Sequence, residues 1–189
     1  MDIILVRHGL SEANIEGIYG KDDTPLSKEG RDSLIYTKEK LKDFSYNKIY
    51  SSPLKRAVES SKALGIDNPI LDNRLKEMDF GFFKGMKISW VNKEYPDDMR
   101  KWKSNDPEYI VPGGENREIV YKRVKDFLEE KVRENEDILI ISHEGVIKLA
   151  FCWVLDNIDY YYNFKIENAS INLIRVENNR KIIMKENLI

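Results

Sequence analysis

An apolar run that leads directly into an Arg-His pair is the feature of this sequence that most limits its fold. Residues 3–7 have the apolar pattern of a strand buried on both faces of a sheet, and His8 follows at once. The pattern recurs at residues 138–142, which lead into His143, and these are the 2 histidines of the chain. In an open α/β sheet, ligands bind beyond the carboxyl ends of the strands. The two histidines and Arg7 therefore predict an anion site, with phosphate as the expected ligand.

A third junction of the same kind follows the predicted strand at residues 48–51. Ser52 is a favourable N-cap and Pro53 a favourable first helical residue, so we expect a helix to begin here. Arg56 then lies in the first turn, near a helix N-terminus that favours anions. The sequence thus predicts that Arg56 joins the phosphate site.

Strand and helix patterns alternate along the chain. Helices are expected after Ser27 and over the following ranges: 54–64, 117–133 and 146–155. The Asn178-Asn179 pair suits a tight turn between two terminal strands. The alternation predicts a three-layer α/β/α sandwich with a mostly parallel central sheet and an antiparallel hairpin at its edge. We expect a single domain over residues 1–189.

The charge balance limits the partners. Lys and Arg total 31 and Asp and Glu 33, giving a formal net charge of -2, which argues against nucleic acid or a membrane surface as partner. No apolar segment is long enough to span a bilayer, and the N-terminus has no signal-peptide pattern. Cys152 is expected to be buried packing. These observations favour the cytoplasm.

Residues 82–109 differ from the rest in combining aromatic and basic side chains without a clear period. We expect an inserted, lid-like segment of short helices that extends to about residue 112. Trp90 and Trp102 are the candidates for substrate selectivity, because insertions over α/β sheets often carry specificity. The alternative is that these aromatics only form a satellite core.

Several further motifs appear in a fixed order along the chain. The Arg7-His8-Gly9 triplet is followed by Asn14, PLSKEG at 25–30, SSPLKRA at 51–57, LKEMDFG at 75–81, PGGE at 112–115 and SHEG at 142–145. Together with the two strand–histidine junctions, this ordered set resembles the histidine phosphatase superfamily, the phosphoglycerate-mutase-like enzymes. The EMDFG stretch and the short chain are most similar to the short bacterial phosphatases typified by alpha-ribazole phosphatase.

The resemblance implies a metal-independent acid or neutral phosphatase that hydrolyses a small phosphorylated metabolite through a phosphohistidine intermediate. Alpha-ribazole 5'-phosphate is one expected substrate, and no metal or other cofactor is implied. In this family pattern His8 is the nucleophile, Glu77 is the general acid and the phosphate is bound by four side chains: Arg7, Asn14, Arg56 and His143. Asp79, close to Glu77, is expected either to cap the backbone or to face solvent.

Two other functions stay open. A cofactor-dependent phosphoglycerate mutase shares the same core, and a non-catalytic phosphate-binding module is the third possibility. The intact nucleophile and acid argue against the module, because binding alone needs neither. Leu10, Lys84 and Glu144 depart from the residues that are usual in the family, which leaves the substrate open. The oligomeric state is open as well, with a homodimer as one option.

Overall fold

The computed structural model describes residues 1–104, 106 and 108–189. The strands are β1 Asp2–Arg7, β2 Lys48–Ser51, β3 Ile70–Leu71, β4 Ile138–Ser142, β5 Ile171–Glu177 and β6 Arg180–Leu188. The α-helices are α1 Glu12–Glu16, α2 Lys28–Leu41, α3 Lys55–Ala63, α4 Ile88–Glu94, α5 Pro96–Lys103, α6 Arg117–Glu134 and α7 Glu144–Val154. Three short 3-10 helices complete the described elements: η1 Asn73–Leu75, η2 Gly81–Phe83 and η3 Ile158–Asn163.

The described strands form one sheet in the order β3-β2-β4-β1-β5-β6. The four strands β3, β2, β4 and β1 run parallel, and β5 and β6 are antiparallel to their neighbours. The mostly parallel sheet with an antiparallel terminal hairpin is therefore confirmed. Asn178 and Asn179 both have positive φ, as the tight turn between β5 and β6 requires.

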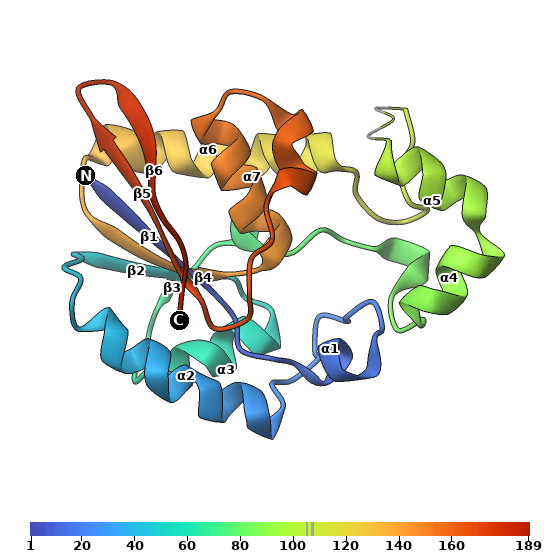
Figure 1. The fold of residues 1–189 in the computed structure, drawn as a ribbon, viewed down its shortest axis with the longest axis horizontal. Coiled ribbons are helices and arrows are strands. Elements are labelled where there is room, and N and C mark those ends of the chain that lie inside the picture. The colour runs from blue at the N-terminus through green and yellow to red at the C-terminus, as the bar shows by residue number, and fades with distance from the viewer. Residues whose placement is uncertain (105, 107) are drawn as a thin grey trace.

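Helices cover both faces of this sheet, which confirms the three-layer sandwich (Figure 1). Side chains alternate between the faces along a strand, and β1 shows the consequence. Ile3 and Leu5 belong to the core beneath α6 and α7, whereas Ile4 and Val6 belong to the core on the α2 and α3 side. Burial on both faces explains why the sequence of β1 is continuously apolar.

The expected helix ranges 54–64, 117–133 and 146–155 agree with α3, α6 and α7 to within two residues at each end. Ser27 caps α2 by accepting from the Gly30 amide, as expected. The expected cap at Ser52 is wrong, because α3 begins only at Lys55 and its N-cap residue is Leu54. The Ser52 hydroxyl instead accepts from the Leu54 amide and contacts His143. Arg56 still lies in the first turn of α3, so its predicted place holds.

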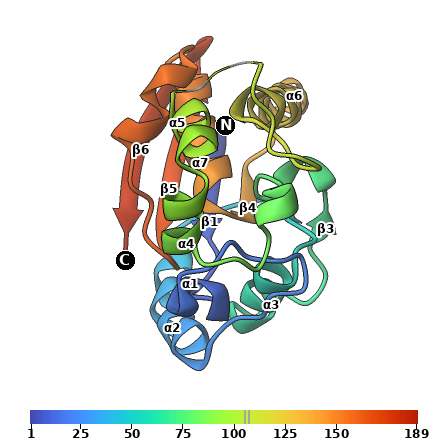
Figure 2. The same ribbon diagram turned by 90° about the vertical axis from the view of Figure 1, so that its right-hand side faces the viewer.

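The predicted insertion consists of short helices, as expected. Figures 1 and 2 place α4 and α5 on the side of the sheet toward which β1 and β4 run. A small separate core lies here: Tyr19, Phe83, Val91, Met99 and Val111. The insertion therefore packs around Tyr19, which lies in the loop after α1, while its role as a lid stays a prediction. Residues 105 and 107 of the insertion lie outside the described residues.

Candidate active site

The register of β1 and β4 brings the two histidines together. Arg7 pairs with Ser142 across the parallel strands, so His8 and His143 leave the sheet at the same level. The His8 amide donates to the Ser142 carbonyl at 2.9 Å. The two imidazole rings then meet edge to face, with centroids 5.1 Å apart. The prediction that His8 and His143 lie side by side at the carboxyl ends of their strands is therefore confirmed.

The ring of His8 is held in one tautomer. Its Nδ1 lies 2.6 Å from the Gly9 carbonyl oxygen. A carbonyl can only accept, so Nδ1 carries the proton and Nε2 keeps its lone pair. Burial, followed by the charges of Arg56 and Arg7, holds the pKa of His8 well below its ordinary value. The result is a neutral imidazole with one free ring nitrogen, the form that acts as a nucleophile.

Gly9 permits this arrangement because of its close neighbours. A Cβ at Gly9 would lie 2.4 Å from the Gly30 carbonyl oxygen, a distance that no real side chain tolerates. The Gly9 amide also donates to the Ser60 hydroxyl at 3.1 Å, which fixes the loop after β1. Steric crowding thus explains why glycine follows the histidine in the Arg-His-Gly triplet.

His143 is fully buried beside His8. Its Nε2 lies 2.8 Å from the Ser52 hydroxyl, whereas its Nδ1 is buried with no hydrogen-bond partner in the part of the chain that the structure describes. Burial, then the charge of Arg56, lowers the pKa of His143 well below its ordinary value. The unpaired Nδ1 is a ring nitrogen still available for a polar ligand atom.

Two arginines reach the same place from different elements. Arg7, at the end of β1, donates from Nη1 to the Ile166 carbonyl, and its Nε is buried without a partner among the described residues. Arg56, in α3, is buried and donates from Nη1 to the Lys21 carbonyl at 3.0 Å. Burial lowers the pKa of Arg56 from its ordinary value, which is so high that the guanidinium stays charged.

Asn14 has a structural task besides the predicted one. Its Oδ1 accepts from the Ser11 amide at 3.1 Å and from the Ser11 hydroxyl at 2.8 Å, in a capping box at the start of α1. These bonds use the acceptor end of the side chain and fix its position. Asn14 lines the cavity beside His8, so its amide nitrogen remains as the donor that phosphate needs.

Glu77 is held against the start of α7. Its Oε2 accepts from the Gly145 amide at 3.3 Å, and its Oε1 accepts from the Met78 amide at 3.0 Å. A Cβ at Gly145 would lie 2.4 Å from Glu77 Oε1, so the close approach depends on this glycine. The SHEG motif therefore supplies both a histidine for the site and space for the carboxylate.

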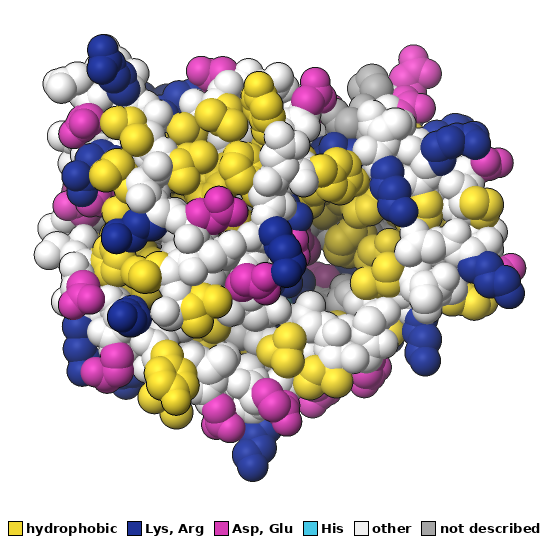
Figure 3. All heavy atoms as spheres, in the orientation of Figure 1, with side chains coloured by type: hydrophobic (Ala, Val, Ile, Leu, Met, Phe, Trp, Pro, Cys, Tyr) yellow, Lys and Arg dark blue, Asp and Glu magenta, His cyan; other side chains and the backbone are white. Residues whose placement is uncertain are grey.

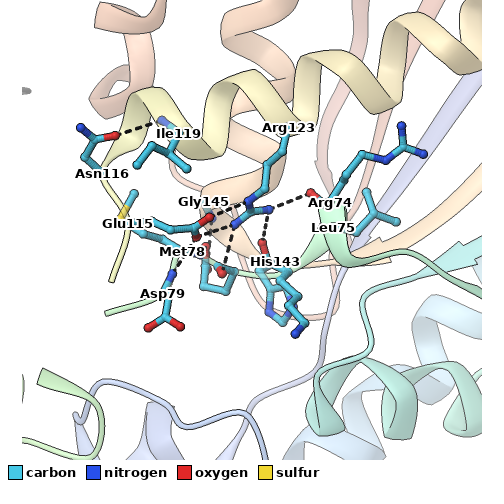
Figure 4. Close-up of polar contacts among 12 residues, drawn as sticks. Arg74, Leu75, Met78, Asp79, Glu115, Asn116, Ile119, Arg123, His143 and Gly145 are labelled. Atoms are coloured by element: carbon cyan, nitrogen blue, oxygen red, sulfur yellow. Dashed lines mark hydrogen bonds and ion pairs between the residues drawn. The ribbon is translucent and has the colours of Figure 1, made fainter. Parts of the chain in front are cut away.

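An arginine that the sequence analysis missed fixes the loop that carries Glu77. Arg123 pairs with Glu115 through Nε at 3.0 Å and Nη2 at 2.9 Å (Figure 4). It also donates to three carbonyls of the loop: Arg74, Lys76 and Glu77. Glu115 in turn accepts from the Asp79 amide at 3.0 Å. Glu115 lies in the quoted PGGE motif, but no spacing signal connects it to Arg123 on α6.

Asp79 proves to be a capping residue. Its Oδ1 accepts from the Gly81 amide at 2.7 Å, and its Oδ2 accepts from Lys84 at 2.8 Å. Burial acts to raise the pKa of Asp79, but the bonds from Lys84 and Gly81 outweigh it and lower the pKa. Lys84 also bonds Asp22 at 3.1 Å. The unusual lysine at position 84 therefore joins two loops beside the site.

Three cavities share Glu77 as a lining residue. The molecule is hollowed between its body and the α4–α5 segment (Figure 3). The histidine cavity, of about 180 Å³, is lined by the predicted side chains Arg7, His8, Asn14, Arg56 and Glu77. His143 contacts His8 but does not line it. The aromatic cavity, of about 230 Å³, is lined by Glu77, Glu144, Lys148 and four rings: Phe80, Trp102, Tyr161 and Tyr162. A third, polar cavity of about 250 Å³ contains Arg56, Glu77 and Lys84.

The two candidate selectivity residues lie in different surroundings. Trp102 lines the aromatic cavity, and its Nε1 donates to the Met78 sulfur at 3.3 Å. Trp90 is 45% exposed and packs against Tyr95, with ring centroids 5.7 Å apart. Trp90 is not among the residues that line the three cavities around Glu77. Selectivity at either position stays a prediction.

Within residues 1–104, 106 and 108–189, no group of three or more His, Cys, Asp or Glu side chains is placed to hold a metal ion. None of the helices in these ranges has the length and apolar character needed to cross a membrane.

Comparison with known proteins agrees with this geometry. Residues 3–188 match the family model of the histidine phosphatase superfamily, branch 1. The chain is 35% identical to phosphoserine phosphatase 1 of Hydrogenobacter thermophilus, over 98% of this chain and 92% of that protein. The structure of the alpha-ribazole phosphatase from Shigella flexneri superposes with a TM-score of 0.88 at 23% identity, covering 100% and 96% of the two chains. The phosphoserine phosphatase mutant of Entamoeba histolytica, solved with phosphoserine, gives 0.85 at 26% identity over 98% and 96%. A match over nearly the whole chain, with two paired strand-end histidines, places this protein in the histidine phosphatase superfamily.

Proposed function

We propose that this protein is a phosphomonoesterase that hydrolyses a small phosphorylated metabolite through a phosphohistidine at His8. The observation that carries the proposal is the 2.6 Å contact between His8 Nδ1 and the Gly9 carbonyl oxygen, in which Nδ1 keeps its proton and donates a hydrogen bond. Its Nε2 is thereby left as a nucleophile in a ring that lines a cavity with Arg7 and Arg56. Two guanidinium groups suit the charge of a phosphoryl group in its transition state.

In the first step, Nε2 of His8 bonds to phosphorus while the bond from phosphorus to the ester oxygen breaks. Glu77, which lines the same cavity, donates its proton to the departing alkoxide and becomes a carboxylate. In the second step, the Glu77 carboxylate takes a proton from water. The water oxygen then bonds to phosphorus, the phosphorus–nitrogen bond breaks, and inorganic phosphate leaves. His143 and Asn14 supply further polar contacts to the phosphoryl oxygens.

The substrate candidates come from the relatives. Phosphoserine is named for the proteins of Hydrogenobacter thermophilus and Entamoeba histolytica, and alpha-ribazole phosphate for the structural neighbour. We place both among the first compounds to test. The reaction uses only side chains, so we propose that no metal is required. A cytoplasmic location, a small-molecule partner and the absence of nucleic-acid binding remain parts of the proposal.

The deciding experiment is a screen of phosphorylated metabolites, scored by released phosphate, with and without a chelator. Activity that survives chelation and is inhibited by vanadate is the expected result. The rival mutase must protect its phosphohistidine from water and pass the group to phosphoglycerate. Transfer between phosphoglycerate isomers that depends on bisphosphoglycerate and exceeds hydrolysis would decide for the mutase. No turnover of any compound, chromogenic esters included, would decide for a non-catalytic module.

A further inference from the structure

Glu144 stands at the boundary between the histidine cavity and the aromatic cavity. It lines both, as does Glu77, whereas Lys148 lines only the aromatic one. The proposed mechanism gives the carboxylate at this boundary no task.

Two cations hold the Glu144 carboxylate. Its Oε2 lies 3.2 Å from Arg7 Nη1, and its Oε1 lies 2.5 Å from Lys148 Nζ one helical turn away. The side chain keeps 31% of its exposure, so these contacts do not bury it. Both partners come from rigid elements, the end of β1 and the first two turns of α7. The carboxylate is thus fixed in place and still faces the cavities.

Arg7 connects this carboxylate to the reacting phosphate. Its Nη1 already has acceptors in the Ile166 carbonyl and Glu144, while its Nε is buried without a described partner. A phosphoryl group that binds Arg7 therefore shares one guanidinium with Glu144. The Glu144 carboxylate, which Lys148 also binds, therefore lies beside the guanidinium that would hold the phosphoryl group.

A charge so placed discriminates between substrates. Compared with a neutral side chain at position 144, the carboxylate reduces the positive charge of Arg7 and Lys148, so it shifts the preference from an anionic group near the ester toward a cationic one. The neighbouring rings act in the same direction, because aromatic faces attract cations. Cations of the protein already lie over two of these rings, since Lys148 lies 5.2 Å from the centre of the Tyr161 ring and Arg117 lies 4.7 Å from that of Tyr162.

We propose that Glu144 determines specificity by selecting phosphomonoesters that carry an ammonium group close to the ester oxygen. Phosphorylated amino alcohols and amino acids form this class. Substrates with a second phosphate or a lone carboxylate at the same distance are disfavoured. The inference rests on the proposed function and names its substrate class.

Three esters of matched size test this inference. O-phosphoethanolamine carries an ammonium group, phosphoglycolate a carboxylate at the same distance, and ethyl phosphate no second charge. The kcat/KM of each is measured for the wild type, Glu144→Gln, Glu144→Asp and the control Glu39→Gln. Glu39 is an exposed glutamate on α2 that also pairs with a lysine, Lys42.

In Glu144→Gln we expect the ratio of kcat/KM for O-phosphoethanolamine to kcat/KM for phosphoglycolate to fall about tenfold or more. The kcat/KM for ethyl phosphate should change by less than about threefold. Glu144→Asp and Glu39→Gln are expected to keep most of the wild-type ratio. If Glu144→Gln does not fold, Glu144→Gly provides the same reading, because it removes the charge without burying a polar group. If the charge-removing variants keep the wild-type ratio of kcat/KM for the two charged esters and still hydrolyse ethyl phosphate, this inference is wrong and the proposed function stands. No hydrolysis of any ester by the wild type overturns the proposed function with it.

Discussion

Gly145 and Glu77 fit together so closely that a Cβ at position 145 would lie 2.4 Å from Glu77 Oε1. One motif thus depends on the other, although they lie far apart in the chain. The carboxylate cannot keep its place unless residue 145 has no side chain. Because Gly145 also donates its amide to Glu77 Oε2, the same residue both admits and holds the candidate acid.

Gly145→Ala is therefore expected to displace Glu77 and to resemble Glu77→Gln. General acid help is typically worth about 10²–10⁴ in rate, and alkyl phosphates need it most because their leaving groups are basic. In both variants, the rate of ethyl phosphate hydrolysis should fall about 100-fold or more. The rate of the phosphorylation step with an aryl phosphate should fall much less. Single-turnover kinetics on both esters measure this. Equal losses on both would remove Glu77 from the role of acid.

Arg123→Ala is expected to act through Glu77. The variant leaves Glu115 without its partner and frees three carbonyls of the loop, at a cost of about 2 kcal/mol in the free energy of unfolding. In the wild-type background it should also lower kcat for alkyl phosphates about tenfold or more. Combined with Glu77→Gln, it should lower kcat little further, since coupled residues are not additive.

The control for this cycle is Lys125→Ala, an exposed residue of the same helix whose partner is Glu129. It should leave both kcat and the unfolding free energy nearly unchanged. Full additivity of Arg123→Ala and Glu77→Gln in kcat would show that Arg123 affects the rate by a route other than Glu77.

The two buried histidines make stability depend on pH below about 6.5. Burial lowers the pKa of His8 and of His143, whereas in the unfolded chain each has an ordinary pKa of about 6.5. Below that pH the unfolded state binds more protons, so stability falls as pH falls. Between about pH 6.5 and about pH 5.5 the two groups together should remove roughly 2 kcal/mol.

Denaturant unfolding at both pH values measures this loss. The chain has only 2 histidines, so the double variant His8→Gln, His143→Gln should show a much flatter dependence in the same window. Carboxyl groups do not interfere, because their ordinary pKa values lie near 4. If the free energy of unfolding of the double variant depends on pH as steeply as that of the wild type, the assignment of these histidines as neutral in the folded state is contradicted.

Trp102 and Trp90 provide a matched pair for the selectivity of the aromatic cavity. Trp102 lines that cavity, and Trp90 packs on Tyr95 away from it. Trp102→Ala should lower kcat/KM for the best natural substrate about tenfold more than for ethyl phosphate, as expected for one lost aromatic contact. Trp90→Ala should show a smaller difference. Equal losses on both substrates, together with a lower Tm, would make Trp102 a packing residue only.

The parts of this account that the sequence could predict depend on local patterns. The buried strands, the capped helix after Ser27 and the histidines at strand ends follow from apolar runs and from one side chain in a known position. Arg56 was placed correctly although its helix begins later than expected, because the first turn tolerates such a shift. These features can be predicted without knowing which distant segments of the chain pack against them.

The parts that escaped the sequence depend on contacts between distant segments. Arg123 lies on a regular helix face, and only the packed structure shows that it holds the Glu77 loop. The task of Gly145 is likewise visible only beside Glu77. Lys84 and Glu144 stand out in the sequence as unusual residues, but residue spacing does not predict their ion pairs with Asp79 and Arg7. β3, with only Ile70–Leu71, was too short to be recognised.

The central claim is that His8 carries the phosphoryl group during turnover. Wild-type protein mixed with an excess of a substrate found in the metabolite screen and quenched within one turnover is examined by mass spectrometry under alkaline conditions. We predict an acid-labile phosphoryl group on His8, absent in a folded His8→Ala variant that has also lost turnover. A phosphoryl group on Ser11, Ser142 or any other residue, or undiminished turnover by His8→Ala, would contradict the account.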